Sequence, residues 1–257
     1  MKKKIRVGII GCGGISKGAH MGAYEKLGKR VEVAALCDII LERAEEARDK
    51  RFPSADVYKD YKDLLKDESI DYVDICTPNY LHSIIAVDAL NAGKHVLCEK
   101  PDAVSVEEAM KMKAASEKNG KKLMVIRNNR FFGTSAEAKK AIANGEFGQI
   151  YAGRCGWIRR RGIPGKGGWF TTKEQSGGGP LIDLGVHVID LSRYLCGNPK
   201  PVSVYGATFQ KLFNRPTVKT GKGYTSVSAG DNDICDVEDL ATALIRYDNG
   251  AVINVEA

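Results

Sequence analysis

The stretch GIIGCGGIS, residues 8–16, decides the fold of the first half of the chain. It follows a short apolar run and opens a helical pattern, and Gly11, Gly13 and Ser16 occupy the three positions of a G-x-G-x-x-G fingerprint. The first glycine permits a tight turn and the second lets the backbone approach a pyrophosphate. The third position packs between helix and strand, where serine is small enough. The cofactor-binding residues predicted in this loop are Gly11, Gly13, Gly14 and Ile15.

Residues 5–127 alternate between two patterns. Short apolar or β-branched runs predict strands buried on both faces: IRVGIIG, VEVAALCD, YVDICTP, KHVLCE and KLMVIR. The segments between them carry apolar residues three or four apart and predict helices, of which the last two end near Gly93 and Gly120. Strand and helix in alternation predict parallel βαβ units, so residues 1–127 are expected to form an α/β domain with a doubly wound parallel sheet.

Asp38 supports the prediction of a dinucleotide site. It ends the second predicted strand, and an acid there can bind both ribose hydroxyls of an adenosine while repelling a 2′-phosphate. Ile39 follows it, with no adjacent arginine or lysine to hold such a phosphate. The sequence therefore favours NAD over NADP. Without the acid, a glycine turn in an unrelated α/β protein would be the alternative.

The pattern changes after about residue 128. A helix is predicted in SAEAKKAIANG, and strands are predicted in QIYAGRCGWI, PVSVYGATFQ, DLATALIRYD and AVINVEA. Few long helices separate the late strands, so residues 128–257 are expected to form a largely antiparallel α+β domain. The run AVINVEA is expected to end as a strand with nothing to cover or pair it, as in a domain that is short at its C-terminus.

The segment SGGGPLIDLGVHVIDL, residues 176–191, predicts a glycine loop running into an apolar helix. On an ideal α-helix Asp183 and His187 lie about 40° apart, and Asp190 falls within about 20° of Asp183. These polar side chains therefore share one stripe. The stripe is either a buried histidine satisfied by an acid or a substrate wall facing an interdomain cleft. Asp190 is expected to anchor the helix or the histidine.

Composition excludes several classes of protein. The chain has 257 residues, 43% of them hydrophobic, which suits one large or two smaller globular domains. Its seven cysteines are scattered without a C-x-x-C, so neither a disulfide framework nor a metal site is predicted, and the cytoplasm is the expected compartment. The N-terminal apolar run is broken by glycines, which indicates neither a signal peptide nor a membrane span.

The basic and aromatic stretch RRRGIPGKGGWF, residues 159–170, could contact nucleic acid, but the net charge of +7 is a mild excess and no nucleic-acid module accompanies it. A flexible lid is favoured, with arginines that contact an anionic substrate or only solvent. Cys12, Cys76 and Cys98 are interpreted as small buried residues, because no recognised signature places a histidine beside them.

Two further motifs, CTPNYLH at residues 76–82 and CEKP at 98–101, follow the carboxyl ends of strands, where doubly wound folds bind ligands. Together with GIIGCGGI and the GGG…D-x-G-x-H-x-x-D stretch they resemble the Gfo/Idh/MocA family, named for glucose–fructose oxidoreductase and inositol dehydrogenase. The resemblance covers nearly the whole chain. It implies a Rossmann domain, a C-terminal α/β domain with an open sheet, and an NAD(P)-dependent oxidoreductase of sugars, polyols or their derivatives. It also implies a homo-oligomer, dimer or tetramer.

The resemblance also assigns site residues. The catalytic residues that it implies are Lys100, Asp183 and His187. Those that contact the cofactor or shape its pocket are Thr77, Pro78, Asn79, His82, Glu99 and Lys100. Substrate contacts are implied for Lys100, Asp183 and His187, and by weaker matches for Arg130 and Trp169, with Asn129 in the same segment as Arg130. Family members usually continue past the point where this chain stops, so substrate contacts from that region are expected to be missing.

The expected chemistry is hydride transfer between a secondary alcohol carbon and the nicotinamide. His187 exchanges the hydroxyl proton, Lys100 polarises the oxygen, and Asp183 orients the substrate or the imidazole. Two alternatives stay open: an enzyme that cleaves glycosides through transient oxidation by tightly held NAD, and a non-catalytic cofactor-binding fragment. His20 and His95 are interpreted as structural.

Overall fold

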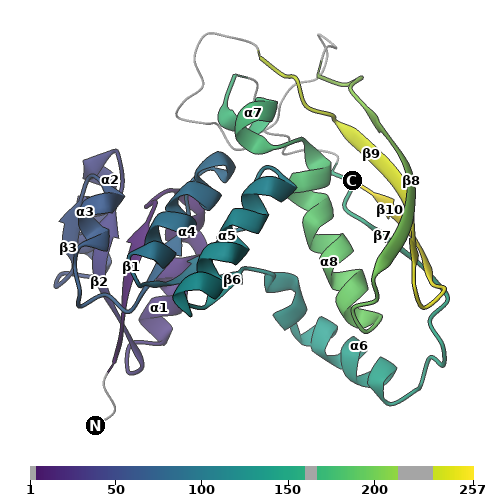
Figure 1. The fold of residues 1–257 in the computed structure, drawn as a ribbon, viewed down its shortest axis with the longest axis horizontal. Helices are drawn as coiled ribbons and strands as arrows, with labels where there is room; N and C mark the ends of the chain where they lie inside the picture. Colours follow the sequence, from purple (N-terminus) through teal and green to yellow (C-terminus); the bar gives the residue numbers. More distant parts are fainter. Residues whose placement is uncertain (1–3, 160–166, 214–233) are drawn as a thin grey trace. The chain divides into compact units, whose positions relative to one another are not determined.

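The computed structural model describes residues 4–159, 167–213 and 234–257, which fall into two compact units, Met1–Ile126 and Arg127–Ala257. The described residues of each unit build one β-sheet (Figure 1). No helix among them is long and apolar enough to cross a membrane.

The first unit contains a six-stranded parallel sheet in the order β3-β2-β1-β4-β5-β6. Its strands are β1 (Ile5–Ile10), β2 (Val31–Cys37), β3 (Asp56–Tyr58), β4 (Tyr72–Ile75), β5 (His95–Cys98) and β6 (Leu123–Val125). The prediction of a doubly wound parallel sheet is confirmed. The strand order reverses between β1 and β4, and ligands of such sheets bind at the carboxyl ends of the strands beside that point.

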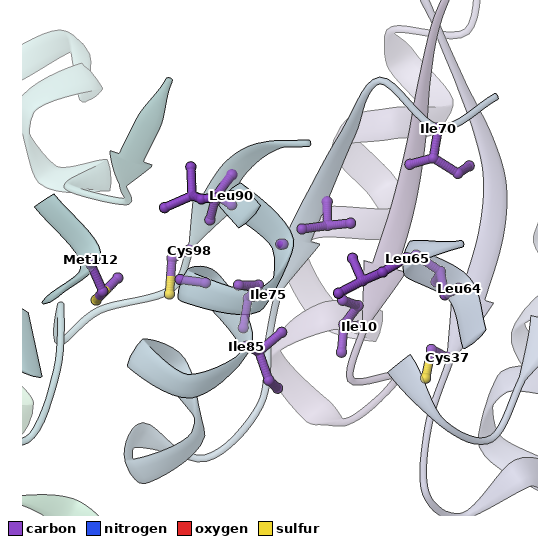
Figure 2. Close-up of a cluster of buried hydrophobic side chains, with 14 of the residues drawn as sticks. Ile10, Cys37, Leu64, Leu65, Ile70, Ile75, Ile85, Leu90, Cys98 and Met112 are labelled. Carbon is purple, nitrogen blue, oxygen red and sulfur yellow. The ribbon is translucent and has the colours of Figure 1, made fainter. Parts of the chain in front are cut away.

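Helices cover both faces of this sheet (Figure 1). They are the π-helical turn η1 (Ser16–His20) running into α1 (Met21–Lys26), then α2 (Leu41–Arg51), α3 (Tyr61–Leu65), the short 3₁₀ turn η2 (Asn79–Leu81), α4 (His82–Asn91) and α5 (Val106–Asn119). Because both faces are covered, successive strand residues enter different cores. Val7 and Ile9 join the cluster under α1 and α2, whereas Ile10 joins the cluster under α3, α4 and α5 (Figure 2).

Helix α5 shows how the local sequence sets its ends. Ser105 at its N-terminus accepts a hydrogen bond from the Glu108 backbone N–H, which satisfies a donor that the helix leaves unpaired. Gly120 at its C-terminus adopts φ +60°, a left-handed conformation that costs glycine little.

The sequence patterns did not predict β3 and α3, because these elements are only three and five residues long. β3 pairs with β2 through Asp56–Tyr58 at the edge of the sheet. Asp60 caps α3 by accepting a hydrogen bond from the Lys62 N–H at 2.9 Å. Such short elements depend on the sheet edge more than on their own periodicity.

The second unit has a mixed four-stranded sheet in the order β7-β10-β9-β8. Its elements are η3 (Asn128–Phe131), α6 (Gly133–Ala143), β7 (Ala152–Gly156), η4 (Trp169–Thr171), α7 (Lys173–Ser176), η5 (Leu181–Gly185), α8 (Val186–Leu195), β8 (Pro201–Phe209), β9 (Leu240–Tyr247) and β10 (Val252–Glu256). β9 pairs antiparallel with β8 and β10, and β7 pairs parallel with β10. Ile189 of α8 packs on a core that contains Ile245, Ile253 and Val255.

The expectation that the last strand would have nothing to cover or pair it is wrong. β10 lies inside the sheet and is hydrogen-bonded on both sides, to β7 and β9. Ile253 and Val255 are only 2% and 1% exposed, because they face the core beneath α8. The sequence alone places a strand at residues 251–257, but its position in the sheet depends on parallel pairing with β7, about a hundred residues earlier.

The helix predicted within residues 176–191 begins at Leu181, and its first turn is not α-helical. A π-helical turn, Leu181–Gly185, precedes the α-helix Val186–Leu195. A π-turn has more residues per turn than an α-helix, so the spacing expected between Asp183 and His187 on an ideal α-helix does not apply. His187 and Asp190 do lie on one α-helix, three residues apart.

The predicted lid and basic segment of residues 159–170 lies largely outside the described residues, because 160–166 are not among them. Its later part is described: Trp169 and Phe170 stack with ring centroids 3.8 Å apart.

Candidate active site

The glycine turn after β1 has the geometry that the fingerprint requires. Gly11 adopts φ +97°, and a Cβ there would stand 2.7 Å from the Cys76 carbonyl oxygen at the end of β4, so no other residue fits. Gly13 and Gly14 differ, because a Cβ at either position would meet no atom within 4 Å. The open space beside these two glycines is where the fingerprint expects a pyrophosphate.

Two buried hydroxyl groups at the same edge of the sheet support a ligand there. Ser16 Oγ, at the start of η1, and Thr77 Oγ1, just after β4, are shielded from solvent and have no hydrogen-bond partner among the described residues. Buried polar atoms are rarely left unsatisfied in folded proteins, and those that are call for an explanation. A phosphate or amide group of a bound dinucleotide would supply acceptors and donors at this edge.

Asp38 directly follows β2 and is 7% exposed. Its Oδ2 accepts a hydrogen bond from the Cys12 N–H and its Oδ1 accepts one from the Ile40 N–H, each at 2.9 Å. The carboxylate therefore holds the glycine turn in place. Each oxygen keeps a further lone pair, so the predicted bonds to ribose hydroxyls remain chemically open.

His82 connects the loop after β4, which contains Thr77, with the loop after β5, which contains Pro101. Its ring is fully buried at the start of α4, with Nδ1 2.7 Å from the Pro101 carbonyl oxygen and Nε2 2.9 Å from that of Thr77. Burial lowers the pKa of His82, although both carbonyl contacts oppose that change. The histidine therefore shapes the site by linking the loop after β4 to the loop after β5.

His20 holds the EKP loop, residues 99–101 after β5, through a contact with Glu99. Glu99 is 9% exposed; its Oε1 lies 2.9 Å from His20 Nε2, and its Oε2 accepts a hydrogen bond from the Lys100 N–H at 3.0 Å. Burial would raise the pKa of Glu99, but the bond from His20 and the charge of Lys100 lower it, so the side chain is a carboxylate. Lys100 itself is half-buried and precedes a cis peptide bond to Pro101.

No recognised signature placed a histidine beside a cysteine, yet His20 Nδ1 lies 3.4 Å from Cys76 Sγ. The thiol is still no nucleophile. Burial, followed by the nearby Asp74 carboxylate, raises the pKa of Cys76 to about 12. Cys12 and Cys98 are also fully buried with raised pKa values, mainly through burial.

In the second unit, the glycine run has a packing role that the sequence did not reveal. Glu238 accepts hydrogen bonds from the N–H groups of Gly179 and Leu181, at 2.9 and 3.1 Å. A Cβ on Gly179 would stand 2.0 Å from the Glu238 carbonyl oxygen. The run is therefore glycine because another segment approaches its backbone. Glu238 sits in no motif, so no sequence signal pointed to it.

Asp183 lies in the π-turn and lines a cavity of about 420 Å³ within this unit. Aromatic side chains, among them Trp157 and Phe170, line the same cavity. His187, on the first turn of α8, packs its ring against Trp157 with the centroids 5.8 Å apart. Trp157 thus touches both the cavity and the predicted proton-transfer residue.

Asp190 serves as an anchor with Arg130 as its partner. Arg130 donates two hydrogen bonds to the Asp190 carboxylate, at 2.7 and 2.5 Å, and its guanidinium lies 5.0 Å from the centre of the Tyr194 ring. These contacts tie η3 to α8. A substrate contact by Arg130, like that by Trp169, stays a prediction.

Comparison with known proteins agrees with both units. Residues 5–127 match the family described as an oxidoreductase family with an NAD-binding Rossmann fold, and residues 135–257 match the GFO/IDH/MocA C-terminal domain. The chain is 35% identical over 252 residues to D-glucoside 3-dehydrogenase of Escherichia coli (strain K12), covering 98% of this chain and 69% of that protein. It is 34% identical to levoglucosan dehydrogenase of Pseudarthrobacter phenanthrenivorans (strain DSM 18606 / JCM 16027 / LMG 23796 / Sphe3), covering 99% of this chain and 67% of that one.

Solved structures agree as well. An oxidoreductase domain protein from Kribbella flavida superposes with a TM-score of 0.86 at 30% identity, and levoglucosan dehydrogenase in complex with NADH and levoglucosan does so with 0.83 at 32%. Each alignment covers 99% of this chain and 67% of the other. The chain thus spans about two thirds of the length of these relatives. It belongs to the Gfo/Idh/MocA family of oxidoreductases, and its first unit is the family's NAD-binding Rossmann domain.

Proposed function

We propose that this protein oxidises a secondary hydroxyl group of a sugar, a polyol or a derivative, with NAD as the hydride acceptor. The observation that carries the proposal is the edge of the first sheet: Gly13 and Gly14 leave open space in the turn after β1, Asp38 holds that turn through the Cys12 N–H, and the EKP loop follows β5 at the same edge. Hydroxyl-bearing sugars follow from the relatives, which include a D-glucoside 3-dehydrogenase and a levoglucosan dehydrogenase.

The fit to NAD rests on three features of the first unit. The glycine turn leaves space for a pyrophosphate, the Ser16 and Thr77 hydroxyls have no hydrogen-bond partner in the part of the chain that the structure describes, and Asp38 can accept from ribose hydroxyls. Ile39 beside Asp38 is 79% exposed and offers no charge to a 2′-phosphate. When bound, NAD supplies the hydride acceptor.

The chain's own residues handle the proton. In this proposal the Lys100 ammonium lies against the substrate oxygen and lowers the pKa of the hydroxyl group. His187 accepts the hydroxyl proton as the carbon loses its hydride, so the products are a carbonyl compound, NADH and a proton. Asp183 hydrogen-bonds the substrate or the imidazole. In reduction the same groups act in reverse.

The decisive experiment is an assay of NADH formation with a panel of methyl glucosides, levoglucosan and myo-inositol. We expect turnover with at least one sugar, and we expect His187→Ala to lower kcat by roughly 10²–10⁴-fold, the usual contribution of a general base. His95→Ala is the matched control. His95 begins β5, at the end of the strand opposite the EKP loop, and accepts a hydrogen bond from the Lys122 N–H. Near-normal turnover by His187→Ala would remove that residue from its role.

The same assay tests the rival functions. Cleavage of a glycoside without net NADH would favour transient oxidation by retained NAD. Tight NADH binding with no turnover on any sugar of the panel would favour a non-catalytic, cofactor-binding protein. Sugar-dependent NADH formation contradicts both.

We also propose a homo-oligomer and a cytoplasmic location. The outer face of the second sheet, opposite α8, carries exposed apolar side chains on β8 and β9, including Tyr205 at 82% and Leu244 at 46%. A second copy would cover them. All seven cysteines are free thiols, as a reducing compartment would keep them.

A further inference from the structure

A buried histidine joins two carboxylates beneath the EKP loop. His20 ends η1; its Nδ1 lies 2.7 Å from Asp74 Oδ2, and its Nε2 lies 2.9 Å from Glu99 Oε1. All three residues are at most 9% exposed. They come from the first helix, from β4 and from the end of β5, so one imidazole connects three parts of the first unit.

The geometry requires a doubly protonated ring. A carboxylate only accepts hydrogen bonds, so each ring nitrogen must donate. Burial by itself would lower the pKa of His20, but hydrogen bonds with Asp74, Cys76 and Glu99 raise it to about 12. Asp74 is held from its other side by the Tyr24 hydroxyl, which donates to Oδ2 at 2.8 Å. The imidazolium is thus a fixed cation between two fixed anions.

A metal site is a weaker explanation of the same residues. His20, Asp74 and Cys76 offer ligand atoms within 4.8 Å of one another. However, the 2.7 Å separation of Nδ1 and Oδ2 is that of a hydrogen bond, and Nε2 is already used by Glu99. A metal would need one of these nitrogens without its proton.

The network reaches the main chain of Lys100. One oxygen of Glu99 accepts from His20 and the other accepts from the Lys100 N–H. On the far side of Lys100, the Pro101 carbonyl oxygen contacts His82. The backbone that carries the lysine is therefore held before and after the residue by two histidine-centred contacts.

We propose that His20 is a positioning residue for Lys100: by bridging Asp74 and Glu99 it fixes the carboxylate that holds the Lys100 amide, and so orients the lysine for its part in the reaction. The inference rests on the proposed function for the role of Lys100, and on geometry alone for the link between His20 and Lys100. No sequence motif indicates this role of His20, because Asp74 and Glu99 lie 54 and 79 residues away from it.

The test compares His20→Gln with His95→Gln in the whole chain. Two measurements do not depend on turnover: hydrogen exchange at the Lys100 amide and the Kd for NADH. For His20→Gln we expect exchange at Lys100 to accelerate about tenfold or more, because Glu99 is no longer held, while the Kd for NADH changes less than threefold. We expect kcat to fall about tenfold or more, since small misplacements of a reacting group are costly. His95→Gln is expected to match the wild type in all three.

A double-mutant cycle separates positioning from general stabilisation. In a Lys100→Met background, His20→Gln should change kcat less than twofold, because the group that it positions is gone. Equal losses of kcat in both backgrounds, or unchanged exchange at Lys100, would overturn the proposal. If His20→Gln does not fold, Glu99→Ala replaces it: this change removes the acceptor of the Lys100 N–H, so the same changes in exchange at Lys100 and in kcat are expected. A wild-type chain that oxidises no sugar would overturn the proposed function, while exchange at Lys100 would still test the link to His20.

Discussion

Asp38 has two tasks at one position. Its carboxylate holds the turn after β1 through the Cys12 N–H, and it is the residue expected to bind the adenosine ribose. The sequence indicates the second task, because an acid at the end of the second strand is part of the dinucleotide pattern. The first task needs the folded turn and could not be foreseen from spacing.

Asp38→Asn should change cofactor choice and also weaken the glycine turn, because its single acceptor oxygen can accept from only one of the Cys12 and Ile40 N–H groups. The amide keeps one acceptor oxygen and loses the charge that repels a 2′-phosphate. We expect the Kd for NAD to rise about tenfold, as for loss of one charge-assisted hydrogen bond of about 1.5 kcal/mol or more, and the preference for NAD over NADP to shrink. Titration with both cofactors measures this change. An unaltered ratio of the two Kd values would show that Asp38 does not contact the ribose.

The histidines show where residue-level prediction stops. The resemblance implies a catalytic role for His187, which lies in a motif, whereas the sequence indicates only a structural role for His20. His20 lies in no motif, and its two partners come from distant strands. A buried histidine between two acids is a tertiary arrangement, so the sequence pattern contains no signal for it.

At the scale of elements, long periodic segments were predictable and special turns were not. The apolar runs located five strands of the first sheet, whereas β3 and α3 were too short to show a period. Each unit also has a π-turn among its candidate site residues, Ser16–His20 in the first unit and Leu181–Gly185 in the second. Such turns are often found at functional sites, and no residue pattern announces them.

Gly179→Ala tests the packing role of the glycine run. The new methyl group would overlap the Glu238 carbonyl oxygen, which is backbone and cannot rotate away. We expect the free energy of unfolding of the second unit to fall by about 3 kcal/mol, the upper range for overpacking. Gly133→Ala at the start of α6 is the control, because a Cβ there meets no atom within 4 Å. Equal urea midpoints for the two variants would contradict the predicted overlap.

At the scale of the whole molecule, the family resemblance supplied what periodicity could not. Periodicity indicated a parallel sheet followed by a mostly antiparallel one, and the motifs identified the family. The place of β10 at the centre of its sheet was not predictable, because its parallel partner β7 is remote in sequence. The register between β8 and β9 also shows that Tyr205 and Leu244 share the outer face of this sheet.

Oligomerisation through that outer face gives the last prediction. Tyr205 of β8 pairs with Leu244 of β9, and both point away from the core residue Ile245. If a second copy covers this face, Tyr205→Lys combined with Leu244→Lys places two charges in an apolar interface, and light scattering should report dissociation to the monomer at micromolar concentration. Val204→Lys is the control, because Val204 is 65% exposed and lies on the opposite face of the same strand, beside Ile245. A doubly substituted protein with the wild-type mass in solution would exclude this face as the contact, because two buried, unpaired lysines would cost several kcal/mol per copy.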